Sequence, residues 1–98
     1  MGGATVIYKQ DLLNACLNET VFVGSDGQMW LVVGRSSKEG QLQHLVLQNR
    51  ADSRFVDVAW CRKGGTRGLI DISTGEFVKE FIVGDSRVTT KSQIRKTQ

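Results

Sequence analysis

From Glu19 onward, apolar residues recur at alternate positions in short runs, and this period of two constrains the fold more than any other feature. Glycine-bearing turns separate the runs every 8–14 residues, and no segment between them could form a crossover helix. The strands must therefore pair in antiparallel fashion. We predict about six short strands, close to residues 21–23, 29–33, 42–47, 55–60, 69–72 and 76–83.

The segment before these strands has a helical period instead. Polar residues occupy the opposite side of its apolar stripe, which indicates a short amphipathic helix over about residues 8–18. Asn18 can end this helix, because asparagine tolerates the left-handed backbone conformation found after helix ends. The predicted apolar stripe consists of Leu12, Leu13, Cys16 and Leu17.

Together these elements predict a mainly β fold, a small antiparallel meander closed halfway into a barrel, with one short N-terminal helix. The arrangement is similar to SH3-type and OB-type small barrels, which implies a binding role more than catalysis. The alternation predicts a core of Leu13, Val21, Val23, Leu31, Val33, Leu45, Leu47, Val56, Val58, Phe77 and Phe81.

The charge is unevenly distributed along the 98 residues, whose formal net charge is +3. Residues 1–83 hold nine basic and nine acidic side chains and are neutral overall. The excess lies after Gly84, where four basic residues face Asp85 alone. We therefore predict one domain over residues 1–84 and a flexible basic tail over 85–98. The basic residues of that tail are Arg87, Lys91, Arg95 and Lys96.

The segment Arg62–Gly68 is the strongest candidate binding site, because it combines three cations with three glycines. Glycine lets backbone N–H groups approach a phosphate closely, and a preceding tryptophan could stack on a base. The candidate ligand-binding residues are Trp60, Arg62, Lys63, Gly64, Gly65 and Arg67, with the basic tail as an electrostatic auxiliary. A solubilising hairpin loop beside a core tryptophan explains the same residues, and the exposure of Trp30 and Trp60 stays open.

Catalytic and metal chemistry find little support in the sequence. One histidine and two distant cysteines do not make a metal site, and we expect no cofactor. His44 could pair with Cys16 or Cys61, but each has a structural explanation, although neighbouring cations would make Cys61 a reactive thiol. The carboxylates that might act as acid and base fit the polar half of alternating strands. These are Asp57, Asp71 and Glu80.

We therefore expect a non-enzymatic binding module that engages single-stranded nucleic acid or another phosphate backbone. The alternative is a protein-binding adaptor, or a small inhibitor of a larger enzyme, that uses a sheet edge or the leucines of the helix. No apolar run is long enough to span a membrane and no signal peptide is recognisable, so we expect no membrane partner. A reducing cytoplasm with two free thiols is the expected location.

Overall fold

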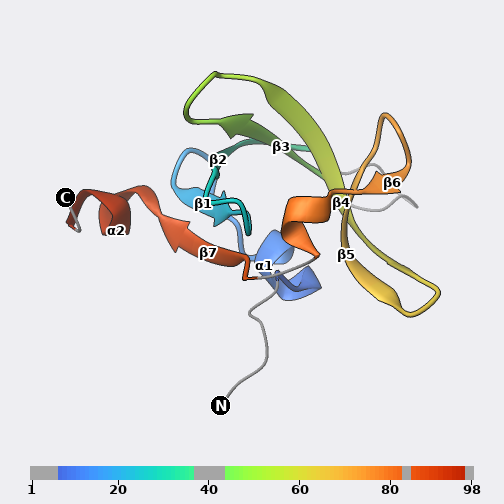
Figure 1. Cartoon of the computed structure of the whole chain (residues 1–98). Helices are drawn as coiled ribbons and strands as arrows, with labels where there is room; N and C mark the ends of the chain where they lie inside the picture. The colour runs from blue at the N-terminus through green and yellow to red at the C-terminus, as the bar shows by residue number, and fades with distance from the viewer. Residues whose placement is uncertain (1–6, 37–43, 83–84, 97–98) are drawn as a thin grey trace, which may run out of the picture.

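In the part of the chain that the structure describes, one antiparallel sheet of seven strands contains about half of the residues (Figure 1). The computed structural model describes residues 7–36, 44–82 and 85–96. The strand order is β6-β5-β4-β3-β2-β1-β7, so successive strands are neighbours until β7 returns to pair with β1. The strands are β1 (Thr20–Val23), β2 (Met29–Ser36), β3 (His44–Asn49), β4 (Phe55–Lys63), β5 (Thr66–Asp71), β6 (Glu76–Phe77) and β7 (Arg87–Thr90). The helical elements are α1 (Lys9–Leu13), the 3-10 turn η1 (Lys79–Phe81) and α2 (Lys91–Lys96).

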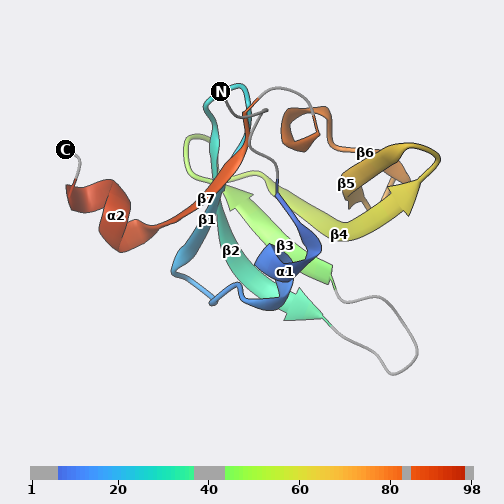
Figure 2. The same cartoon turned by 90° about the horizontal axis from the view of Figure 1, so that it is seen from below.

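The predicted mainly β fold is confirmed, with seven strands in place of about six. Strands β6 and β7 remain at the two edges of the sheet, which curls without closing into a barrel (Figure 2). The predicted single helix is wrong in number, because α2 and η1 add helical turns near the C-terminus.

The core lies on the face of the sheet where apolar cross-strand partners stack. Val32 pairs with Leu47, which pairs in turn with Val56, and Leu45 pairs with Val58. All but the half-buried Val56 are almost fully shielded from solvent. Burial of these side chains supplies the main driving force for holding the central strands together. From other elements the core also receives Ile7, Leu12, Phe22, Trp30, Leu69 and Phe81.

Six of the eleven predicted core residues are buried, and the clearest departures lie in β2 and in the N-terminal helix. In β2 the buried side chains are Trp30 and Val32, whereas Leu31 and Val33 are half-exposed. Alternation could not select the face of this strand, because both of its faces are apolar, and the large indole lies on the core side. The half-buried residues of the predicted core outside β2 are Val56 and Phe77. Its fully buried residues are Val21, Val23, Leu45, Leu47, Val58 and Phe81.

The helix α1 is much shorter than the predicted helix over residues 8–18. After Leu13 the chain turns, and the backbone N–H of Asn18 donates to the Val32 carbonyl at 2.7 Å. Asn18 has a φ of 61°, so its tolerance of the left-handed region is used in a loop that joins β2. Only one residue of the predicted stripe, Leu12, is buried, while Leu13, Cys16 and Leu17 are exposed.

A β-bulge in β2 reverses the faces of the residues that follow it. Val32 pairs with Leu47, but the next pair is Gly34 with Val46, so one residue of β2 has no partner. A single extra residue shifts the alternation of side chains by one position. Arg35 therefore lies on the same side of the sheet as the core.

Arg35 fastens the chain after α1 to the sheet. Its guanidinium Nη2 donates to the backbone carbonyls of Leu12 at 3.0 Å and Ala15 at 2.7 Å. The Leu12 carbonyl belongs to the last turn of α1 and the Ala15 carbonyl follows the helix, so Arg35 holds both the helix end and the chain after it against the sheet.

Replacement of Arg35 with Ala should lower the free energy of unfolding by about 2 kcal/mol, because two charge-assisted hydrogen bonds are lost. Arg35→Lys should lose most of the same stability, because a single ammonium lacks the planar fork. Urea denaturation measures both variants. The exposed Arg50→Ala serves as control and should change stability by less than about 0.5 kcal/mol. Equal midpoints for the Arg35 and Arg50 variants would contradict this role.

The last predicted strand, over residues 76–83, is wrong from Val78 to Ile82, while Val83 lies outside the described residues. The strand β6 has two residues, and the chain then forms η1, which buries Phe81 to 1% exposure. Ile82 lies so close to Gly68 of β5 that an added Cβ would collide with its Cγ2. A helical turn that packs against β5 therefore occupies the place of the predicted extended strand.

Residues 85–96, the described part of the predicted tail, do not form the frayed segment that we expect from their polarity. Arg87–Thr90 form β7, which pairs with β1 from Thr20↔Thr90 to Val23↔Arg87, and α2 follows. Lys91 continues the attachment, because its backbone N–H donates to the Glu19 carbonyl at 2.9 Å. Backbone pairing, which needs no apolar pattern, explains why the sequence does not indicate this strand.

Candidate functional site

The predicted glycine-rich loop is a tight hairpin turn that joins β4 to β5. Gly64 and Gly65 alone reverse the chain, with Gly64 at a φ of +61°, whereas the predicted loop extended over seven residues. Arg62 and Lys63 belong to β4 and Arg67 to β5, so the cations occupy strand positions. The tip of this hairpin extends away from the rest of the sheet (Figure 1, yellow).

Strand positions bring the hairpin cations together in a defined arrangement. Arg62 and Arg67 are direct cross-strand partners, and Lys63 pairs with Thr66 on the other face. All three cations are exposed, and no described carboxylate lies within salt-bridge distance of them. Like charges directly opposite each other destabilise a hairpin. The electrostatic repulsion between Arg62 and Arg67 therefore destabilises the hairpin locally, and a bound anion would reduce this repulsion.

A hollow of about 280 Å³ lies beside the turn, and we call it the hairpin hollow. Its lining combines aromatic, aliphatic and cationic groups from the N-terminal segment, both strands of the hairpin and the chain after η1. The lining residues are Ile7, Tyr8, Trp60, Gly65, Thr66, Arg67 and Ile82. The structure thus brings Trp60, Gly65 and Arg67 of the predicted site together around one hollow.

The two tryptophans differ in their surroundings. Trp60 is half-buried, packs against the core and also lines the hairpin hollow, so neither of the two sequence interpretations describes it fully. Trp30 is only 8% exposed, and the Arg54 guanidinium lies 5.6 Å from its ring centroid. Trp30 is therefore a core residue with a cation over its ring.

Tyr8 is a hollow-lining residue that sequence reasoning missed. It lies just before α1 and is 57% exposed. Its backbone N–H donates to the Asp11 carboxylate at 2.7 Å, which fixes the chain where it enters the helix. Nothing in the sequence relates Tyr8 to Trp60, because only the fold of the sheet places them at one hollow.

The tail cations do not join the hairpin cations. Arg87 is on β7 and Lys91 begins α2, at the opposite end of the sheet from the β4–β5 turn (Figure 2). Arg95 and Lys96 also belong to α2. Lys91 instead shares a small hollow of about 220 Å³ with Arg50. Any help from the tail must therefore come from a ligand that reaches across the sheet.

A larger hollow of about 520 Å³ lies at the other end of β4, and we call it the acidic hollow. It is lined by four carboxylates and two cations, together with aromatic side chains that include the 65% exposed Phe55. The carboxylates are Asp26, Asp71, Glu76 and Glu80, and the cations are Arg54 and Lys79. Phe55 begins β4 and Lys63 ends it, so about 26 Å of strand separates the acidic hollow from the hairpin tip.

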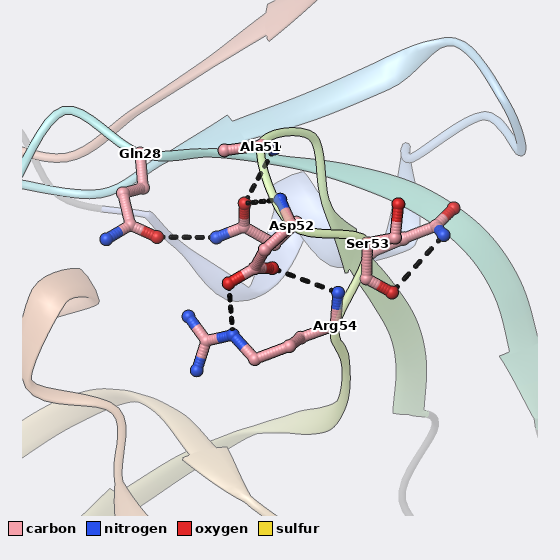
Figure 3. A network of polar contacts seen from close by, with 7 residues as sticks. Gln28, Ala51, Asp52, Ser53 and Arg54 are labelled. Carbon is pink, nitrogen blue, oxygen red and sulfur yellow. Dashed lines mark hydrogen bonds and ion pairs between the residues drawn. The ribbon is translucent and has the colours of Figure 1, made fainter.

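A polar network orders the β3–β4 turn that borders the acidic hollow (Figure 3). The side-chain amide of Asn49 is 1% exposed; it donates to Gln28 Oε1 and accepts from the N–H groups of Ala51 and Asp52. Asp52 accepts from Arg54 twice, at its backbone N–H (3.0 Å) and at Nε (2.6 Å). The turn thus positions Arg54 over Trp30.

The Arg54 backbone N–H, followed by the Arg54 guanidinium, holds the pKa of Asp52 below its ordinary value. Asp52 therefore stabilises the fold above the ordinary aspartate pKa, and this contribution is lost as the pH falls through the lowered pKa.

Asn49→Ala should lower the free energy of unfolding by about 2–3 kcal/mol, because it leaves two backbone N–H groups and Gln28 without their partner. Chemical denaturation measures this loss. Gln48→Ala removes only a long, exposed hydrogen bond to the Ser53 carbonyl and should cost less than about 0.5 kcal/mol. A loss as small for Asn49 would show that the turn does not depend on its amide.

The remaining candidate chemical groups lie on several elements, and of these His44, opposite Ala59, shares a sheet face with Cys61 two residues further along β4. Cys16 is an exposed free thiol and Cys61 a half-buried one, and Asp57 and Asp71 lie on opposite faces because Asp71 pairs with Val58. Within residues 7–36, 44–82 and 85–96, no three histidine, cysteine, aspartate or glutamate side chains lie close enough to hold a metal ion. In the same ranges no helix has the length and apolar character needed to cross a membrane.

Comparison of the chain with family models, with curated proteins and with solved structures finds no match. The arrangement of the hairpin cations, the two hollows and the sheet is therefore the basis for a functional assignment.

Proposed function

We propose that this protein is a non-enzymatic module that binds single-stranded nucleic acid at the tip of the β4–β5 hairpin. The observation that carries the proposal is the direct pairing of Arg62 with Arg67, both exposed and without a carboxylate partner among the described residues. Two guanidinium groups side by side suit the phosphates of a nucleic acid backbone.

The surroundings of the tip favour a single strand over a duplex. Tyr8 and Trp60 border the hollow beside Arg67, and aromatic rings next to cations are the usual means of holding unpaired bases. Residues 1–83 carry no excess charge, and Arg62, Lys63 and Arg67 gather at one narrow hairpin tip, which suits a single strand better than the broad surface of a duplex. The tail cations would add attraction without sequence preference. The two free thiols agree with a reducing cytoplasm as the proposed location.

Titration of a single-stranded oligonucleotide at several salt concentrations tests this function. Each phosphate contact on a single strand contributes about 0.7 to the log–log salt slope, so Arg62→Ala/Arg67→Ala should lower it by about one to one and a half units. Arg50→Ala/Lys79→Ala removes the same charge from exposed positions elsewhere and should leave most of the slope.

The same pair of variants controls for folding. Relief of the repulsion between Arg62 and Arg67 should leave the stability of the hairpin variant unchanged or slightly raised. No binding by the wild-type protein at low salt would overturn the proposed function, as would equal salt slopes for the two double variants.

A second candidate is the binding of a cationic protein segment in the acidic hollow. Its carboxylates outnumber its cations, and the side chains of Glu76 and Glu80 make no hydrogen bond or ion pair with other described residues. The exposed Phe55 supplies an apolar contact beside them. Of the leucines predicted to contact such a partner, Leu12 is buried in the core, whereas Leu13 and Leu17 are exposed.

Affinity for a short peptide rich in lysine and arginine distinguishes this candidate from the first. Glu76→Gln/Glu80→Gln should weaken peptide binding several-fold at low salt, because each carboxylate contributes an electrostatic attraction to the cationic peptide. Asp57→Asn removes another exposed carboxylate, outside the hollow, and should have little effect. Peptide binding that is unchanged by the Glu variants would exclude the acidic hollow as its site.

A further inference from the structure

Trp60, which lines the hairpin hollow, carries a polar group whose hydrogen-bonding capacity the fold does not use. The indole Nε1 of Trp60 is shielded from solvent and has no hydrogen-bond partner among the described residues. A buried N–H without an acceptor costs about 1–3 kcal/mol, and native proteins rarely tolerate one without a reason. A ligand that offers an acceptor in the hollow would remove this cost.

The lining of the hollow restricts what that ligand can be. Ile7 and Ile82 are aliphatic, and Tyr8 presents an exposed aromatic ring, so the walls suit a flat, partly apolar group. Arg67 supplies a cation at the same hollow, close to its cross-strand partner Arg62. A flat ring with a hydrogen-bond acceptor, attached to an anionic backbone, satisfies all of these groups at once.

We propose that the hairpin hollow holds one unpaired base of the bound strand, stacked on Tyr8 and accepting a hydrogen bond from Trp60 Nε1. This inference rests on the proposed function and names the part of the ligand that the hollow receives. The phosphates next to the base lie at Arg67 and Arg62.

Entry of the base requires a small movement, since the indole nitrogen is covered in the free protein. Tyr8, Thr66 and Arg67 are the lining residues with exposed side chains, and the Arg67 guanidinium makes no hydrogen bond or ion pair with another described residue. The Arg67 side chain can therefore move aside without breaking a polar contact to the described fold.

A thymidine oligonucleotide and an abasic oligonucleotide of the same length separate the base from the phosphates. The wild-type protein should bind the thymidine strand about five- to one-hundred-fold more tightly, with a similar salt slope for both. In ¹H–¹⁵N spectra the Trp60 indole resonance should shift on addition of the thymidine strand, while that of the core residue Trp30 should not.

Two substitutions then locate the base. Trp60→Phe keeps an aromatic ring but removes the N–H, and Tyr8→Leu removes the stacking surface; each should reduce the preference for the thymidine strand. Binding of the abasic strand should stay unchanged, which also shows that the variants are folded. Phe55→Leu is the matched control, because it removes an exposed aromatic ring at the other end of β4 and should keep the preference.

Each failure has a distinct meaning. Equal binding of both strands by the wild-type protein, with a steep salt slope, would overturn the base site and leave the phosphate-binding function standing. A base preference that is lost in Phe55→Leu but kept in Trp60→Phe and Tyr8→Leu would also overturn it, because the base would then lie outside the hairpin hollow. Absence of binding to either strand would overturn both proposals.

Discussion

A single sheet has no second layer to cover its apolar face, so burial of that face requires the sheet to curve around it. The central strands meet this requirement through the stacked partners Val32, Leu47 and Val56, next to Leu45 and Val58. Every other part of the fold covers what this curved surface leaves open. The segment around α1 adds Leu12 on one side, and η1 adds Phe81 on another.

The bulge in β2 connects this core to the functional region. By reversing the faces after Val32, it places Arg35 where its guanidinium can hold the carbonyls of Leu12 and Ala15. That attachment fixes the N-terminal segment, and with it Tyr8, against the sheet. A stabilising contact in β2 thereby determines one wall of a hollow whose other walls come from β4 and β5.

Strand β4 carries opposite chemistry at its two ends. At its start, Phe55 lines a hollow in which carboxylates outnumber cations. At its end, Arg62 and Lys63 form no ion pair with a described carboxylate. Phe55 and Lys63 lie about 26 Å apart along the extended β4, and the carboxylate Asp71 lies about 13 Å along β5 from Arg67, which is still beyond the distance of about 8 Å over which physiological salt screens exposed charges. The overall neutrality of residues 1–83 therefore conceals two regions of opposite charge.

The sequence by itself determined the class of fold. The alternation of apolar residues and the spacing of glycine turns predict antiparallel strands, and the clustering of Arg62, Lys63 and Arg67 is visible without any structure. These are local features, which depend on neighbouring residues only. The glycines also predict a reversal of the chain at the point where Gly64 adopts a positive φ.

The tertiary structure alone decided which faces are buried and which residues meet. Both faces of β2 are apolar, so the choice of Trp30 over Leu31 came from the partners across the sheet. The strand β7 forms because the backbone of β1 has an edge with which it can pair. The polar sequence of β7 does not predict this pairing. Tyr8 and Trp60 line the same hollow only because the fold brings the N-terminal segment next to β4. Contacts between distant residues depend on the register of the strands, and register is set by the packing of the whole core.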